Sequence, residues 1–153
     1  MRPSIWMLFI STGLVIAAEP VDQGPSKVDA AKLQGVWSIV SVEVEGNPLA
    51  MDKLDEARLI VRGEHYSFRL EGIELEIVYR MDAGKSPKAI DLTLTDGVHK
   101  GKVFRGIYKL DKDRYTICRT TEPEKARPAE FATRPGSGHM MVVWKRAAAS
   151  VSK

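Results

Sequence analysis

The sequence has a single cysteine, Cys118, so no disulfide bond can form within the chain. Its longest mainly apolar run, residues 5–16, is shorter than the ~20 residues that a membrane-spanning helix needs. Basic and acidic residues are interleaved, and the formal net charge is only +3. No basic stripe suited to a phosphate backbone results, so we expect no nucleic-acid partner.

The chain is also poor in the side-chain groupings that carry catalysis or bind metals. Its three histidines, His65, His99 and His139, form no H-x-x-x-H motif. Ser137 lies in Gly-Ser-Gly, which is not the Gly-x-Ser-x-Gly motif of a nucleophile elbow. We therefore expect no catalytic residues, no metal site and no cofactor, and the protein is predicted not to be an enzyme.

Residues 1–18 have the layout of a secretory signal peptide. A short basic start precedes the apolar run 5–16, and Ala17 and Ala18 supply small residues for cleavage. This segment predicts export to the periplasm or the extracellular space, with no transmembrane segment left after cleavage. The alternative is that the segment is retained as an N-terminal anchor.

The chain that follows the predicted signal peptide is divided into three parts. Residues 19–32 form a polar leader and a short helix, which we expect to span Lys27–Leu33 with Ser26 as its N-cap. Residues 33–146 form the folded domain. Residues 147–153 are predicted to be a disordered tail.

Within 33–146 the apolar residues recur with a period of two, which is typical of β-strands. In the first strand we expect the valines to share one face, opposite Trp37 and Ile39; the valines are Val36, Val40, Val42 and Val44. Turn signals recur every ~8–12 residues, and no long amphipathic helix is present to connect parallel strands. The sequence therefore predicts an all-β fold, an antiparallel up-and-down β-barrel of about eight strands with a short N-terminal helix.

Gly35-Val36-Trp37, at the start of the first strand, resembles the Gly-x-Trp signature of lipocalins and their calycin relatives. The resemblance implies that a basic residue of the last strand packs across the tryptophan, and Arg146 or Lys145 is the candidate. A guanidinium over an indole ring is a cation–π contact. We therefore expect Gly35, Trp37 and Arg146 to close the barrel.

Residues 33–146 resemble, more specifically, an uncharacterised lipocalin-like domain family that is abundant in planctomycete bacteria. The matching segments are Leu33–Trp37, Pro87–Leu92, Lys100–Lys102, Gly106–Tyr108, Arg127–Phe131 and Pro135–His139. This resemblance implies a calycin-like barrel, and it brings no established activity with it.

The apolar face of the strands is the candidate lining of a ligand cavity. Its members are Trp37, Ile39, Ile77, Tyr79, Leu92, Leu94, Ile107, Ile117 and Val143. We take Trp37, Tyr79 and Ile107 as candidate ligand-binding residues of the interior. A solidly filled core requires the same pattern, so both interpretations stay open.

The segment Thr121–Gly138 is a long connection rich in proline and glycine. We expect Arg127, Glu130 and Phe131, together with His139, to lie at the mouth of the barrel and contact a ligand there. In the simpler interpretation the prolines and glycines only direct the path of the chain, and Arg127 pairs with Glu130.

These observations lead to three functional hypotheses. The first is an exported binding module for a small apolar or amphipathic ligand. The second is a non-catalytic structural or interaction domain of the cell envelope with a filled barrel and an unknown protein partner. The third is a barrel-based enzyme, which would need converging polar groups at the mouth.

Overall fold

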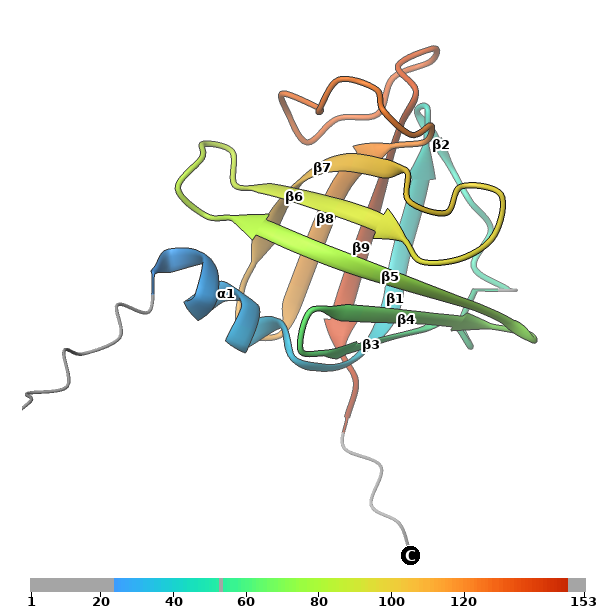
Figure 1. Ribbon diagram of the computed structural model, residues 1–153. Helices are drawn as coiled ribbons and strands as arrows, with labels where there is room; N and C mark the ends of the chain where they lie inside the picture. The colour runs from blue at the N-terminus through green and yellow to red at the C-terminus, as the bar shows by residue number, and fades with distance from the viewer. Residues whose placement is uncertain (1–23, 53, 149–153) are drawn as a thin grey trace, which may run out of the picture.

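The computed structural model describes residues 24–52 and 54–148, so the predicted signal peptide and the end of the predicted tail lie outside the described residues. These two ranges contain one helix and nine strands (Figure 1). Their bounds are α1 (Pro25–Leu33), β1 (Gly35–Val44), β2 (Asn47–Pro48), β3 (Arg58–Arg62), β4 (His65–Leu70), β5 (Ile73–Asp82), β6 (Ala89–Leu94), β7 (Val103–Leu110), β8 (Arg114–Thr120) and β9 (His139–Arg146).

The strands form one antiparallel sheet that closes on itself. From β3 to β9 each strand pairs with the next along the chain, and β1 pairs with both β3 and β9. The two-residue strand β2 pairs only with the end of β1. The other eight strands therefore form a closed up-and-down barrel, which confirms the predicted fold. Closure pairs the strand edges that an open sheet would expose.

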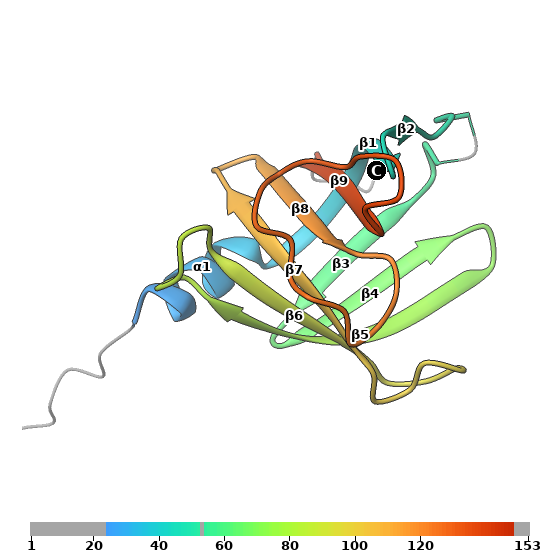
Figure 2. The same cartoon turned by 90° about the horizontal axis from the view of Figure 1, so that it is seen from above.

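The barrel has two distinct ends. We call the closed end the one that carries α1 and the β3–β4, β5–β6 and β7–β8 turns, and the open end the one that carries the other connections (Figures 1 and 2). No helix in the described ranges is long and apolar enough to cross a membrane. Helix α1 covers the closed end, where it contacts β5 and β7.

The N-terminus of α1 differs from the sequence prediction. The helix begins at Pro25, directly after Gly24, where the missing N–H of proline costs no hydrogen bond. Ser26 is therefore inside the helix and does not cap it. Its Oγ instead accepts a hydrogen bond of 3.0 Å from the N–H of Ala83, in the β5–β6 turn. Ser26 thus fastens the helix to the closed end.

Strand β1 contains an irregularity that changes which residues face inward. Its pairing with β9 shifts between Ile39 and Ser41, so one extra residue is present there. As a result Val42 is buried in the same core as Trp37 and Ile39, while Val40 is exposed. The predicted grouping of Val42 with the outward valines was wrong, because a bulge reverses the alternation beyond it.

Trp37 is the largest side chain of the closed-end core. It is completely buried, and its Nε1 donates a hydrogen bond of 2.8 Å to the carbonyl oxygen of Leu33. The guanidinium of Arg146 lies 4.2 Å from the centre of its ring. The structure therefore contains the predicted contact between the first and last strands.

Arg146 also fastens the segment that joins α1 to β1. Its Nη1 donates to the carbonyl oxygen of Gln34 (2.9 Å) and its Nη2 donates to that of Lys32 (2.7 Å). Gly35 has a φ of +120°, and a Cβ at this position would lie 3.2 Å from Arg146 Nη1. Both the positive φ and the close guanidinium favour glycine here.

An ion pair between the buried Asp29 and the half-exposed Lys88 holds α1 against the barrel. The Asp29 carboxylate accepts hydrogen bonds from Lys88 Nζ (2.7 Å) and from Tyr108 Oη (2.8 Å). Burial by itself would raise the pKa of Asp29, but the hydrogen bonds from Lys88 and Tyr108 bring that pKa below its ordinary value. The folded protein therefore favours the ionised carboxylate.

Replacing Trp37 should test the role of the closed-end core. We expect Trp37→Ala to lower the free energy of unfolding by ~3–5 kcal/mol, because a large buried side chain leaves a cavity. Urea unfolding measures this loss. Val36→Ala, at the adjacent and 41% exposed position, is the matched control and should cost less than ~1 kcal/mol. A loss below ~1 kcal/mol for Trp37→Ala would contradict the assigned role.

The ion pair of Asp29 predicts a pH-dependent stability. Because the folded-state pKa is lowered, the stabilisation is complete above the unfolded-state pKa of about 3.8 and disappears as the pH falls through the folded-state value. At neutral pH, Asp29→Asn should therefore lower the free energy of unfolding by ~1–3 kcal/mol. The difference from the wild type should shrink below pH ~4.

Asp96 provides the control for this pH series. It is exposed and forms no ion pair with a described residue, so Asp96→Asn should leave stability nearly unchanged at every pH. A deficit in Asp29→Asn that stays constant from neutral to acid pH would show that the carboxylate charge is not the source of the stabilisation.

Candidate functional site

The open-end half of the barrel contains an apolar cavity of about 280 Å³. The strands contribute most of its wall, and the β2–β3 connection contributes two leucines. The lining residues are Ile39, Val42, Leu49, Leu54, Leu59, Tyr66, Phe68, Leu75, Ile77, Leu92, Tyr115, Ile117, Arg119, Met140, Val142 and Trp144. All of them except Arg119 are apolar or aromatic, so the wall is suited to an apolar guest.

A second, smaller cavity of about 100 Å³ adjoins the first. It is lined by Leu75, Ile77, Leu92, Leu94, Phe104 and Arg119, four of which also line the larger cavity. Ligand pockets begin at ~300 Å³, so the combined space is of the right order for a small molecule. The barrel interior is therefore not solidly filled.

A layer of tyrosines separates the cavity from the closed-end core. The hydroxyls of Tyr66 and Tyr115 share a hydrogen bond of 2.7 Å. The ring of Tyr66 lies 4.5 Å from that of Tyr79, and the ring of Tyr115 lies 6.0 Å from that of Trp37. Burial raises the pKa of both Tyr66 and Tyr115 well above the ordinary value, so both phenols stay protonated.

Arg119 is the one charged side chain that lines either cavity in the described part of the chain. Its Nη1 donates a hydrogen bond of 2.8 Å to the carbonyl oxygen of Thr120, and its guanidinium lies 5.3 Å from the ring centre of Phe104. It forms no ion pair with any described carboxylate. Burial lowers the pKa of Arg119 to about 10, so it is still cationic at neutral pH.

Gly106 makes room for this arginine. The two residues are directly paired across β7 and β8. A Cβ on Gly106 would lie 3.0 Å from the Cβ of Arg119 and 3.0 Å from the carbonyl oxygen of Cys118. A larger residue at position 106 would clash with both atoms, because neither can move far within a paired strand.

The predicted interior residues Trp37 and Tyr79 point inward but do not line either cavity. Both lie nearer the closed end, beyond the tyrosine layer. Tyr79 Oη donates a hydrogen bond of 2.8 Å to the carbonyl oxygen of Gly63 and accepts one of 3.1 Å from Gln34 Nε2. Tyr79 thus joins the β3–β4 turn to the segment after α1, which is a structural role.

Ile107 faces the outside of the barrel and not its interior. On β7 the inward positions are those of Phe104, Gly106 and Tyr108, so the alternation places Ile107 on the opposite face. It is nonetheless buried, because the connection 121–138 crosses the outer face of β7 and β8 (Figure 2). Ile107 is therefore buried by the connection and not by the barrel interior, although it is apolar like the interior residues.

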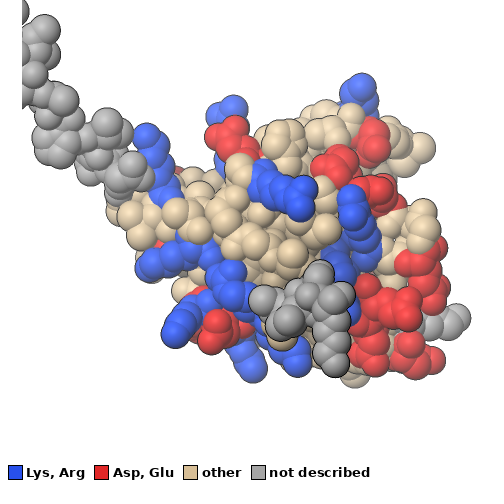
Figure 3. All heavy atoms as spheres, turned by 90° about the horizontal axis from the view of Figure 1, so that it is seen from below, with Lys and Arg blue, Asp and Glu red and all other residues tan. Residues whose placement is uncertain are grey.

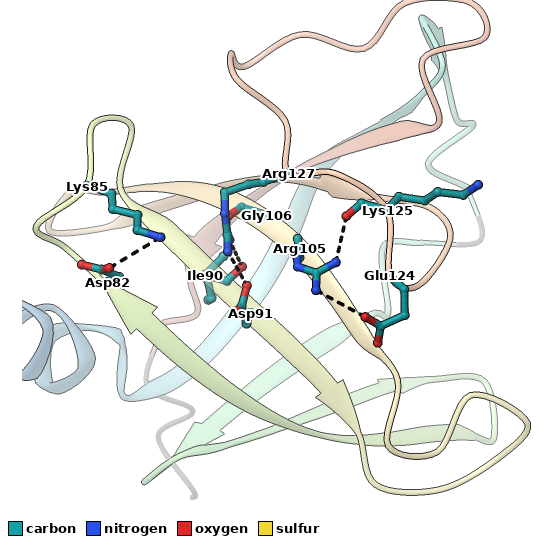
Figure 4. A network of polar contacts seen from close by, with 9 residues as sticks. All are labelled: Asp82, Lys85, Ile90, Asp91, Arg105, Gly106, Glu124, Lys125 and Arg127. Atoms are coloured by element: carbon teal, nitrogen blue, oxygen red, sulfur yellow. Dashed lines mark hydrogen bonds and ion pairs between the residues drawn. The ribbon is translucent and has the colours of Figure 1, made fainter.

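Arg127 lies on the outer face of the sheet and not at the mouth of the barrel (Figure 4). Its Nη1 donates to the carbonyl oxygens of Ile90 (2.9 Å) and Gly106 (2.7 Å), and its Nη2 contacts Asp91 Oδ1 at 2.7 Å. Arg105, the residue before Gly106 on β7, contacts the same connection (Figure 4). Arg127 therefore anchors the connection to β6 and β7.

The other predicted residues of this connection also lie outside the barrel. Glu130 forms an exposed ion pair with Arg134 at 2.8 Å and does not pair with Arg127. The ring centre of Phe131 lies 4.2 Å from Lys109 Nζ, on the outward side of β7. Neither residue lines the barrel cavities. The interpretation that this connection mainly covers the sheet fits these contacts.

His139 is the first residue of β9 and lines a different, polar cleft of about 390 Å³. This cleft lies beneath the connection 121–138, between residues such as Glu45, Thr121 and Lys125. It shares no lining residue with the barrel cavities. Although the cleft is larger, its lining residues are mainly polar or glycine, so the apolar barrel cavity is the better candidate for a ligand site.

Arg119 is the residue that sequence reasoning missed. The signal was present, because Tyr115, Ile117 and Arg119 alternate along β8 and must share one face. An arginine on the inward face of an otherwise apolar strand is unusual.

The described residues contain no group of three His, Cys, Asp or Glu side chains arranged to hold a metal ion. Cys118 is buried on the outward face of β8, with its Sγ 3.7 Å from the carbonyl oxygen of Ala132. Burial raises the pKa of the thiol, which disfavours the reactive thiolate.

No protein-family model, no curated protein and no solved structure matches this chain. The interpretation of the site therefore depends on its geometry and its chemistry.

Replacing Arg127 should release the connection from the sheet. Arg127→Met removes two hydrogen bonds and an ion pair at a 24% exposed side chain, so we expect a loss of ~2–3 kcal/mol in the free energy of unfolding. Arg134→Met removes an exposed ion pair and should cost less than ~1 kcal/mol. Urea unfolding compares the two, and equal losses would show that Arg127 is not an anchor.

Proposed function

We propose that this protein is an exported, lipocalin-like barrel that binds a small apolar or amphipathic ligand in its open-end cavity, without catalysis. The observation that carries the proposal is the apolar cavity enclosed by the strands. Transfer of an apolar molecule into such a space gains ~25 cal/mol for each Å² removed from water. The resemblance of residues 33–146 to a lipocalin-like family and the signal-peptide pattern of residues 1–18 support the assignment and the export.

The chemistry of the cavity favours binding over catalysis. Its ionisable side chains are Tyr66, Tyr115 and Arg119, and all three have a pKa far above neutral. A general acid or base works best with a pKa near the operating pH. These groups keep their protons at neutral pH, so they can hold and orient a ligand but are poor at exchanging protons with it.

The alternative of a filled barrel that serves as an interaction domain is weaker, because the interior contains a cavity. Among the exposed large apolar side chains, Leu49, Ile73 and Val98 belong to open-end connections or to a strand start beside one, whereas Val28 lies on α1 and Val36 and Val40 lie on the outer face of β1. An apolar rim eases the passage of an apolar molecule from water into the barrel. The position of the first three supports the ligand-binding proposal.

The surface carries charges of both signs. In the view from below, Lys and Arg gather on the side of α1, while Asp and Glu gather on the opposite side (Figure 3). This face offers no continuous basic surface for a phosphate backbone. The proposal therefore includes no nucleic-acid partner.

A neutral fluorescent probe, N-phenyl-1-naphthylamine, tests whether the cavity accepts an apolar guest. We expect its emission to rise on mixing with the wild-type protein. Val142→Phe fills the cavity from β9 and should abolish the rise, at a cost of ~1–3 kcal/mol in stability. Val143→Phe is the matched control: Val143 was predicted to line the cavity, but it lies between the lining residues Val142 and Trp144 and faces outward, so this variant should bind the probe as the wild type does.

Thermal unfolding checks that both variants are folded before the probe is added. Absence of a fluorescence rise with the wild-type protein would refute the proposal. Equal probe binding by Val142→Phe and the wild type would show that the probe binds outside the cavity, and would also refute the proposal.

A further inference from the structure

Arg119 differs from the arginines of this protein that form ion pairs with carboxylates. Arg69, Arg105, Arg127, Arg134 and Arg146 each contact a carboxylate at the surface. The Arg119 side chain lines the barrel interior, and within the described residues its one hydrogen bond goes to the carbonyl oxygen of Thr120. A guanidinium has five N–H donors, so most of its hydrogen-bonding capacity is unused.

Arg119 is partly buried, and a cation without a carboxylate partner in a largely apolar wall is energetically unfavourable. The charge persists, because the pKa of Arg119 stays near 10 despite burial. In folded proteins such charges are normally paired. A binding site is the common situation in which the partner is supplied from outside, by the ligand.

The surroundings of Arg119 hold its guanidinium at the cavity wall. The guanidinium forms a cation–π contact with Phe104, with 5.3 Å between the guanidinium carbon and the ring centre. Gly106, across the β7–β8 pair, leaves the space that the side chain occupies. Because Arg119 lines both cavities, an anion bound to it would have apolar walls on either side.

We infer that the ligand is an amphiphile with a single carboxylate, which pairs with the Arg119 guanidinium while the apolar body fills the barrel cavity. This inference rests on the proposed function and specifies its ligand class. The planar guanidinium matches a carboxylate in two parallel hydrogen bonds. One arginine balances one negative charge, whereas a phosphate dianion would require a second cation, and neither cavity wall contains one.

The acidic residues near the open end do not oppose this inference. Glu74 is paired with Arg69 at 2.8 Å, and Glu71 is exposed in the β4–β5 turn. Water and salt screen such surface charges within about 10 Å. Arg119 acts inside an apolar wall, where an electrostatic interaction is much stronger.

Displacement of the neutral probe N-phenyl-1-naphthylamine by decanoate and by decan-1-ol at neutral pH tests the inference. The two competitors have the same chain and differ in the charge of the head group. Arg119→Met removes the cation and keeps an apolar side chain of similar length. Arg119→Lys keeps the charge, and Arg80→Met is the control, because Arg80 is exposed on β5 and lines neither cavity.

We expect decanoate to displace the probe from Arg119→Met only at ~10- to 100-fold higher concentration than from the wild type. This factor corresponds to the loss of charge-assisted hydrogen bonds. Decan-1-ol should compete equally well in both. Arg119→Lys should retain part of the preference for decanoate, and Arg80→Met should retain all of it.

Three results would overturn the inference. Two of them leave the proposed function intact. In the first, the Arg119→Met variant binds the probe and decanoate displaces it as well as from the wild type. In the second, decanoate displaces the probe from the wild type no better than decan-1-ol does. The second needs no variant, so it applies even if the Arg119 variants do not fold. In the third the wild type does not bind the probe at all, and then the proposed function fails too.

Discussion

The contact between Trp37 and Arg146 joins the first and last strands of the barrel, and the rest of the structure depends on it. The guanidinium lies 4.2 Å from the indole ring centre and also donates hydrogen bonds to the backbone that enters β1. Here a cation–π contact and backbone hydrogen bonds act on the same side chain. Helix α1, held by Asp29, covers this end of the barrel.

The interior is divided because its large side chains are unevenly distributed. Trp37, Tyr115, Tyr66 and Tyr79 crowd toward the closed end, where their rings contact one another. Beyond them the inward positions are mainly aliphatic, and the strands enclose more volume than these side chains fill. A barrel of eight strands is near the size at which either outcome is possible. The cavity therefore exists because the side chains toward the open end are too small to fill the space that the strands enclose.

Part of the candidate site could be predicted from local pattern, and part could not. The alternation on β5, β6 and β8 correctly placed Ile77, Leu92 and Ile117 on the cavity wall. Ile107 has the same apolar character but faces outward, and it is buried only because the connection 121–138 covers it. A period of two separates two faces, and it does not say which face is interior when a loop buries the other.

The sequence by itself determined the class of the fold and the residues that close it. Alternation and turn residues are local properties, so they predicted the antiparallel barrel, and Gly35, Trp37 and Arg146 were recognisable at the two chain ends of the sheet. Only the tertiary structure decided that Arg127 lies outside the barrel, whereas the alternation along β8 already indicates that Arg119 shares a face with Tyr115 and Ile117. The sequence contexts of these two arginines differ. Their environments differ because one belongs to a connection that folds back over the sheet, whereas the other lies on the inward face of a strand.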